Sequence, residues 1–391
     1  MSRFLVVATA GAGGDLQPLV AAAMALRSRG HETPFFGDSS VERSLAGFGV
    51  DVHTLPSSLD LGPRLGDAIR DAMLATGGDL GAAGPLVERA MAAWAEEMAS
   101  AISPAAAGQR PDAVVTSLFG IEVLTNARLS CPWAVVNSTF YIGPNPPRSV
   151  EQDMGPRAVP LVSRYARLVE SADMVLHATD NVFDFSFKGL PPRHHYTGPL
   201  GLWEPPQNVP SYLDEPGDPW VLVSISSQRQ DDLPLAEAAL GALADRPVRV
   251  LLTIGPEHRP EEISIRPSNA RIEQTVSHSA VLKRGRLLIG HAGHGSVMKA
   301  LWEGRPMVLM PWGRDQPGVA ARAKSLGVAE IVLRGDDSQS ALREAIDRAL
   351  ASTEMQQAAA TQSARLQMTD PPGVAAALLE SLLVTGKRAG L

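Results

Sequence analysis

The chain has 391 residues, of which 45% are hydrophobic and 20% charged, a composition that excludes global disorder. Its length predicts two domains of roughly 200 residues each. The net charge of −7 and the lack of a basic stripe argue against nucleic-acid binding. The single cysteine, Cys131, excludes a disulfide framework and a cysteine-cluster metal site, and we interpret it as a small buried residue.

The sequence predicts neither a signal peptide nor an integral membrane segment. It starts on a strand-like run at 4–8, without a charged lead and a long apolar stretch. No run elsewhere reaches the roughly 18 to 20 apolar residues of a spanning helix. We therefore expect a cytoplasmic protein.

The first half of the chain alternates between apolar runs and helical patterns. Continuous apolar runs rich in β-branched residues are typical of parallel strands buried on both faces. Such alternation predicts an open parallel sheet covered by helices. In chain order, we expect a strand at 4–8, a helix at 18–29, a strand at 33–36, a helix at 40–48, a strand at 50–55, a helical region at 57–109 broken at 77–78 and 84–85, strands at 113–116, 133–136 and 171–178, and a last segment at 196–200.

Two features of this half bear on ligand binding. Met91, Trp94, Met98 and Ile102 recur at helical spacing, which favours core packing. The alternative is the lining of an acceptor pocket, because flexible methionines suit varied apolar ligands. Residues 144–160 form a Pro-rich loop that is long enough to be functional.

A Pro-rich linker at 203–219 is predicted to separate a first domain, 1–202, from a second, 220–391. Two α/β halves of this kind predict a cleft at the carboxyl ends of their strands, where ligands bind. The last helix is a candidate to pack back on the first domain. The second domain is predicted to contain strands at 220–226, 248–254, 287–289 and 307–310 and helices at 232–243, 316–326 and 338–351, with a helical pattern after residue 296.

Two turns in the second half carry the functional signal. Gly290-His-Ala-Gly-His-Gly-Ser296 leads from strand 287–289 into a helix. A helix entered through glycines and a serine presents unpaired N–H groups and its positive dipole end, which favours phosphate. After the next strand, Trp312-Gly-Arg-Asp-Gln316 adds a carboxylate and a carboxamide beside that site. A phosphate site next to such a pair indicates a nucleotide sugar.

These turns resemble the donor-site signature of the UDP-glycosyltransferase superfamily, whose members are inverting, metal-independent enzymes of the GT-B fold. The turn 14–18, Gly-Asp-Leu-Gln-Pro, resembles the Gly-Asp-x-x-Pro of the bacterial antibiotic, macrolide and sterol branch. The resemblance implies an α/β protein with two Rossmann-like doubly wound domains facing across a cleft, acceptor domain first and donor domain second. The positions in register with the donor signature are His291, Gly293, Gly295, Ser296, Leu301, Gly304, Pro306, Pro311, Trp312, Asp315 and Gln316.

The resemblance implies a diphosphate site in the first of these turns. His291 would hydrogen-bond a diphosphate oxygen, and the backbone from Gly293 through Gly295 to Ser296 would surround the phosphates, with the Ser296 hydroxyl as a further donor. Ser227, at the end of the strand 220–226, resembles another phosphate contact. Donors fixed beside the leaving diphosphate stabilise its growing charge, so no metal and no cofactor are expected.

The remaining roles follow in the same way. Asp315 and Gln316, with Trp312, would hold the donor sugar, and backbone groups near Val276 would bind the nucleobase. Asp15 would be the catalytic base, because an inverting transfer needs a group that takes the acceptor's proton as its oxygen attacks.

Each of these residues also has an ordinary structural interpretation. Asp15 and Asp315 are also explained as helix N-caps, and Ser227 as a serine that starts a turn. A histidine at a strand end is often a satisfied structural residue, although the surrounding pattern favours a functional His291. His294 falls at a variable position of the signature, and a ligand contact is the weaker interpretation.

Three positions depart from the family pattern. Thr275 stands where an aromatic residue often stacks on the nucleobase. Lys299 stands where many plant-type members have a ribose-binding glutamate, a loss that a dTDP sugar would tolerate because deoxyribose lacks one hydroxyl. In relatives with a histidine base an aspartate orients the imidazole, and Ser117 takes that place here, which fits an aspartate acting alone.

We therefore expect a glycosyltransferase of natural-product or antibiotic biosynthesis, a monomer or homodimer, that moves a hexose from dTDP or UDP to a lipophilic acceptor by O-transfer. A non-catalytic auxiliary protein of the same fold is one alternative, and an epimerase or lipid-linked sugar transferase is another. A dinucleotide-dependent oxidoreductase is a third, because Gly11-Ala-Gly-Gly14 and Asp38 are similar to that fingerprint, although Leu16 replaces its third glycine.

Overall fold

The computed structural model describes residues 1–9, 14–46, 48–143, 145–148, 152, 159–204, 209–227, 230–335 and 338–386. The first half of the chain forms a parallel sheet in the order β3-β2-β1-β4-β5-β6-β7. β1, β4 and β5 are buried along their whole length, as the continuous apolar runs predict. The strands are β1 (Phe4–Ala8), β2 (Phe35–Gly37), β3 (Val52–Thr54), β4 (Ala113–Ser117), β5 (Trp133–Asn137), β6 (Met174–His177) and β7 (His194–Tyr196).

The second half repeats this design with a parallel sheet in the order β10-β9-β8-β11-β12-β13. In both sheets the first strand lies in the interior and the chain then crosses to its other side, which is the doubly wound arrangement. The predicted α/β fold class is thus confirmed. The strands are β8 (Trp220–Ser224), β9 (Arg249–Thr253), β10 (Ala270–Glu273), β11 (Gly285–Gly290), β12 (Met307–Leu309) and β13 (Ala329–Ile331).

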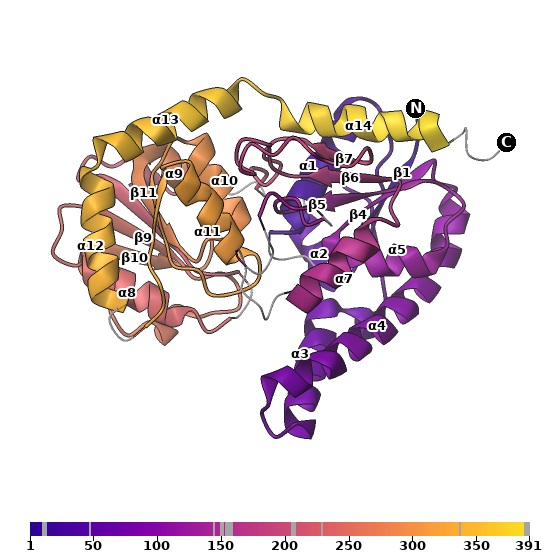
Figure 1. Cartoon of the computed structure of the whole chain (residues 1–391), viewed down its shortest axis with the longest axis horizontal. Helices are drawn as coiled ribbons and strands as arrows, with labels where there is room; N and C mark the ends of the chain where they lie inside the picture. Colours follow the sequence, from indigo (N-terminus) through magenta and orange to yellow (C-terminus); the bar gives the residue numbers. More distant parts are fainter. Residues whose placement is uncertain are drawn as a thin grey trace.

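Helices cover both faces of each sheet (Figure 1). The first half contributes α1 (Leu16–Ser28), α2 (Ser39–Leu45), α3 (Leu61–Ala75), α4 (Leu80–Gln109), α5 (Ile121–Ala127) and α7 (Val159–Val169). The second contributes α8 (Leu233–Leu243), α9 (His278–Arg284), α10 (His294–Trp302), α11 (Gln316–Ser325), α12 (Ser338–Ala351), α13 (Thr353–Gln367) and α14 (Pro371–Gly386). Among the residues described, no helix has the length and apolar character needed to cross a membrane.

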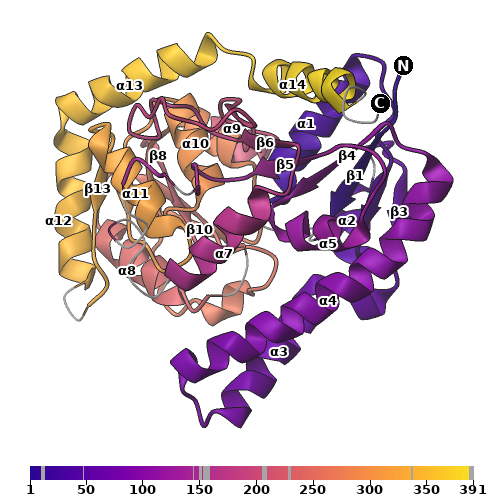
Figure 2. The same cartoon turned by 45° about the vertical axis from the view of Figure 1, so that its right-hand side comes forward.

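The α3–α4 pair extends away from the body of the first half (Figure 2). The predicted break at 77–78 separates the two helices, but the predicted break at 84–85 is wrong, because α4 runs through Pro85 and Pro104. Asp79 accepts from the Gly81 and Ala82 amides and starts α4 upstream of Pro85. The core interpretation of the apolar stripe is confirmed, because Trp94, Met98 and Ile102 are buried and Met91 packs against their cluster.

Several predicted boundaries are wrong by a few residues, as for the helix predicted at 40–48, which ends at Leu45. β10, β13 and α9 were not predicted, since the two strands are short and partly exposed and α9 spans only seven residues. Within the loop predicted at 144–160, residues 144, 149–151 and 153–158 lie outside the described residues, and α7 begins at Val159. In the linker the same holds for 205–208, and the domain boundary at 203–219 stays a prediction.

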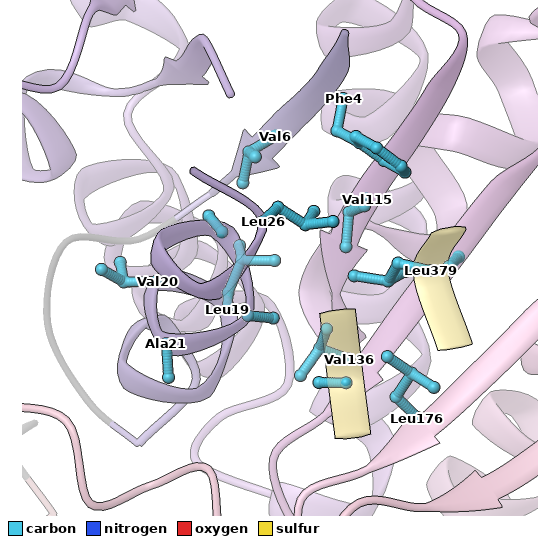
Figure 3. Packing of buried hydrophobic residues seen from close by; sticks show 14 of the residues in the cluster. Phe4, Val6, Leu19, Val20, Ala21, Leu26, Val115, Val136, Leu176 and Leu379 are labelled. Carbon is cyan, nitrogen blue, oxygen red and sulfur yellow. The ribbon is translucent and has the colours of Figure 1, made fainter. Parts of the chain in front are cut away.

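The C-terminal helix packs on the first half of the chain. The predicted last helix, 338–351, is α12, but α13 and α14 follow it. α14 contacts α1, and its residues Leu379 and Leu382 complete the core beneath that helix. Figure 3 shows Leu379 among Leu26 of α1 and strand residues Val115 and Leu176.

Candidate functional site

Three loops at the carboxyl edge of the second sheet each contain a non-glycine residue in the left-handed backbone conformation. These are Asp231 after β8, Ala292 after β11 and Arg314 after β12, with φ of 58°, 67° and 57°. Such conformations cost about 1–3 kcal/mol each and persist where the surrounding structure fixes them. β8 and β11 also flank the point where the strand order reverses, which is the usual ligand-binding edge of such sheets.

The loop after β11 leaves the first backbone amides of α10 without helical partners. Gly293 precedes the helix, and the first helical bond runs from the Val297 amide to the Gly293 carbonyl. The His291 ring is 9% exposed, and its Nδ1 donates to the Ser224 carbonyl oxygen at 3.3 Å. Its Nε2 lies only 2.6 Å from where a Cβ on Gly293 would stand. An imidazole nitrogen and a helix N-terminus therefore meet at one point.

The loop after β12 is tied together by Gln316. Its side-chain oxygen accepts from the Trp312 and Gly313 amides at 2.7 and 3.1 Å. Its amide group donates to the Gln230 side chain at 2.9 Å, which joins this loop to the loop after β8. The Trp312 ring lies beneath the Arg334 guanidinium, 4.3 Å from the ring centroid. Gln316 thus holds the shape of the site in this structure.

Asp315 stands at the N-cap position of α11, but its side chain makes no capping hydrogen bond, so capping does not explain the carboxylate. Burial raises the pKa of this carboxyl group, while the nearby Thr139 hydroxyl and the Asp315 backbone amide lower it. Thr139 belongs to the first half of the chain. The carboxylate therefore lies where the two halves meet.

Asp15 lies on the facing half, directly before α1, and it also makes no capping bond. Its Oδ1 accepts from the Ser138 hydroxyl at 2.8 Å, whereas its buried Oδ2 has no partner among the described residues. Burial raises the pKa of the Asp15 carboxyl, and the charge of Asp315 raises it further. The Ser117 and Ser138 hydroxyls act in the opposite direction. Asp15 is therefore a buried carboxylate with an elevated pKa, and its role as a base stays a prediction.

The loop after β5 links the two carboxylates. Ser138 contacts Asp15 and Thr139 lies beside Asp315. Asn137 fixes this loop, since its side-chain oxygen accepts from the Thr139 amide at 3.1 Å and its amide group donates to the Phe140 carbonyl at 2.8 Å. The sequence indicates residues 137–147 as a loop that could close over an acceptor, but not that Ser138 and Thr139 lie beside the two carboxylates. The polar run that follows the apolar strand 133–136 was the available signal.

Residues 222–371, which include both turns of the second half, match the glycosyltransferase family 28 C-terminal domain. The fold is that of the solved glycotransferase of kitacinnamycin, with a TM-score of 0.72 and 20% identity over 98% of this chain and 99% of that one. It is also that of the glycosyltransferase VinC in complex with dTDP, with a TM-score of 0.70 and 19% identity over 99% and 100% of the two chains.

Residues 222–371 are thus similar to a glycosyltransferase domain, and the chain as a whole has the GT-B fold. Among curated relatives, demethyllactenocin mycarosyltransferase of Streptomyces fradiae is 26% identical over 51% of this chain and 43% of its own length. O-mycaminosyltylonolide 6-deoxyallosyltransferase of the same organism is 25% identical over 83% of this chain and 84% of its own. The match to the first of these relatives thus spans less than half of that protein. The match to a glycosyltransferase domain argues against the oxidoreductase alternative.

Other predicted donor-site positions lie at the same edge of the second sheet. The Ser296 hydroxyl lies 3.4 Å from Nδ1 of His278. Ser227 is half-buried, and a Cβ on Gly255 would come within 2.9 Å of its Cα. The Val276 side chain is buried in the core, which leaves only its backbone for a ligand. Their ligand contacts stay predictions.

Burial lowers the pKa of both histidines at the turn into α10. Burial lowers the pKa of His294 to about 3, and its ring lies edge-on to Phe183, 5.8 Å between centroids. Burial lowers the pKa of His291 as well, while Asp232 opposes this effect. Among the described residues no group of three or more His, Cys, Asp or Glu side chains is arranged to hold a metal ion.

Proposed function

We propose that this chain transfers a sugar from a nucleoside diphosphate, dTDP or UDP, to a hydroxyl group of a lipophilic natural product, with inversion and without a metal. One observation carries the proposal: the Asp15 carboxyl lies close enough to Asp315, across the interface between the two halves, for the charge of Asp315 to raise its pKa. Oδ2 of Asp15 makes no hydrogen bond among the described residues, and Asp315 lies near His291 and the N-terminus of α10. A base and an anion site on opposite sides of one interface are what a single displacement at an anomeric carbon needs.

The donor half supplies the leaving-group site. The backbone amides that open α10 would donate to the diphosphate, together with Nε2 of His291. Because Nδ1 already donates to a carbonyl, Nε2 donates only when the ring is an imidazolium. The unliganded ring is kept neutral by burial, so we propose that diphosphate binding raises its pKa and draws in a proton. That charge would then offset the negative charge growing on the leaving group.

The acceptor half supplies the base. The acceptor hydroxyl would donate its hydrogen to Oδ2 of Asp15 while its oxygen attacks the anomeric carbon. The bond from that carbon to the phosphate oxygen breaks, and its electron pair leaves with the diphosphate. Asp315 and Gln316 would hold the sugar hydroxyls, with Gln316 using the amide hydrogen that Gln230 does not occupy. A single displacement of this kind inverts the anomeric centre.

The nucleotide is proposed to be dTDP rather than UDP. Lys299 is 3% exposed and its Nζ is engaged by Gln17 and Glu204, so this position offers no acceptor to a ribose 2′-hydroxyl. We expect dTDP to raise the melting temperature more than UDP or GDP at equal concentration, as stronger binding to the folded state does. Thermal shift measurements check this, and clearly stronger stabilisation by UDP would contradict it.

Gly293→Ala is expected to weaken nucleotide binding roughly tenfold or more, since an added Cβ would stand 2.6 Å from Nε2 of His291 and force the ring away. Isothermal calorimetry with dTDP measures the loss. Gly335→Ala is the matched control, because a Cβ there meets nothing within 4 Å. Equal affinity of both variants for dTDP would show that His291 does not contact the nucleotide.

The proposed activity is tested with a matrix of dTDP- and UDP-sugars against macrolide, polyketide and glycopeptide acceptors, read by mass spectrometry. A product heavier than the acceptor by one glycosyl unit is the expected result. A chain that binds dTDP yet neither glycosylates any acceptor nor hydrolyses the donor would instead be the non-catalytic auxiliary protein. The names of the relatives given above describe sugar transfer, which supports an enzyme over an auxiliary protein.

A further inference from the structure

One face of α10 lies against the first half of the chain. Gly295 and Lys299 are four residues apart and share this face. An added Cβ on Gly295 would come within 3.6 Å of Oε1 of Gln17, and Lys299 Nζ donates to that same oxygen at 2.9 Å. Gln17 therefore touches α10 both at its opening turn and one turn further on.

Gln17 also lies beside the proposed base. It belongs to the first turn of α1, two residues after Asp15. Gln17, which contacts α10, is thus attached to the same turn as Asp15, the proposed base. A shift of α1 relative to α10 would move Asp15 away from the donor.

The lysine is held on its other side by the segment that leaves the first half of the chain. Glu204 Oε1 lies 3.4 Å from Lys299 Nζ, and the two side chains are 14% and 3% exposed. The same carboxylate accepts from the Ser277 hydroxyl at 2.6 Å and from the His278 amide at 2.9 Å. Ser277 directly follows Val276, the position proposed to meet the nucleobase. Glu204 therefore contacts the segment proposed to bind the nucleoside of the donor, and Gln17 contacts the helix proposed to bind its phosphates.

We propose that Gln17, Lys299 and Glu204 act as a positioning bridge that fixes the distance between the donor and the catalytic base. The inference rests on the proposed function, because it assigns a task within that site. A buried ion pair contributes little net stability, so a buried lysine that joins three separate segments is better explained by the geometry it enforces. Reaction rates depend steeply on such geometry, since a misplacement of about 1 Å can cost ~10²-fold.

Gln17→Leu tests the bridge without removing a charge, because Lys299 keeps Glu204 as its partner. We expect kcat to fall about tenfold or more, while the affinity for dTDP, measured by calorimetry, stays within about twofold. Gln17→Glu restores most of kcat, since a carboxylate oxygen also accepts from the ammonium group. A second variant, Glu204→Gln with Lys299→Met, removes both buried charges together and is expected to lower kcat in the same way.

The control is Arg365→Gln, which breaks another contact between the halves, the ion pair with Asp180, and is expected to leave kcat unchanged. If the wild type transfers sugar and Gln17→Leu has the same kcat, the bridge is overturned and the proposed function stands. If the wild type transfers no sugar, amide hydrogen exchange decides. Faster exchange in residues 16–20 of Gln17→Leu supports the bridge, and unchanged exchange overturns it.

Discussion

Replacing Asp15 with asparagine is expected to lower kcat by about 10²- to 10⁴-fold, the usual loss when a general base is removed. The carboxylate is buried with Oδ2 unpartnered, so the amide keeps its shape and removes only its basicity. Nucleotide affinity is expected to stay unchanged, because the groups proposed to bind the donor lie in the other half of the chain. Steady-state kinetics on a folded variant measures the effect, and full activity would show that Asp15 is not the base.

The pH dependence provides an independent check of the same assignment. A base works when deprotonated, so activity is present above its pKa and is lost as the pH falls through it. Burial raises the pKa of Asp15, which places this acid limb above the ordinary aspartate value of about 3.9. The Ser138 hydroxyl lowers that pKa, so Ser138→Ala is expected to move the acid limb of kcat/KM to higher pH. If the acid limb of kcat/KM does not move in Ser138→Ala, the group that titrates there is not the Asp15 carboxyl bonded to Ser138.

Arg322→Met is expected to cost about 3–5 kcal/mol of unfolding free energy, the largest stability effect we predict, because it leaves a buried charge unpaired. Arg322 on α11 donates from Nε to Asp184 Oδ1 at 2.7 Å, and both side chains are 0% exposed. Asp184 also accepts from the Tyr196 hydroxyl at 2.7 Å and so joins the second half of the chain to β7. Guanidinium unfolding curves measure the loss.

Two variants make this result specific. Arg348→Gln breaks a half-exposed ion pair with Glu330 and is expected to change the unfolding free energy by less than about 1 kcal/mol. Adding Asp184→Asn to Arg322→Met is expected to recover part of the loss, because no charge is then left alone in the interface. A loss below about 1 kcal/mol for Arg322→Met itself would contradict the assignment.

The sequence predicted most of what depends on neighbouring residues. Runs such as 4–8 and 113–116 are strands because their apolar, β-branched side chains fit a sheet buried on both faces. The break at 84–85 was predicted wrongly, since the packing of α4 on α3 and on the first sheet outweighs the hydrogen bond lost at Pro85. α14 was missed because an almost uniformly apolar segment shows no helical period.

The site was predictable only where it follows a strand end. The turns 290–296 and 312–316 are marked by glycines and polar residues directly after apolar runs. Ser138, Gln230 and Glu204 were not recognised, because their partners lie far away in the chain: Ser138 meets Asp15 across 123 residues, and Gln316 meets Gln230 across 86. No local period encodes such contacts, and only the folded chain displays them.

The position of α14 has a consequence for how the protein is made and recombined. The first sheet is synthesised early, but its core is closed by Leu379 and Leu382 from residues 371–386. On the ribosome the apolar surface of this half would stay uncovered until residues 371–386 had emerged. A chimera that exchanges first halves between relatives should therefore carry α14 with the first half, since a junction at the linker alone pairs one protein's core with another's final helix.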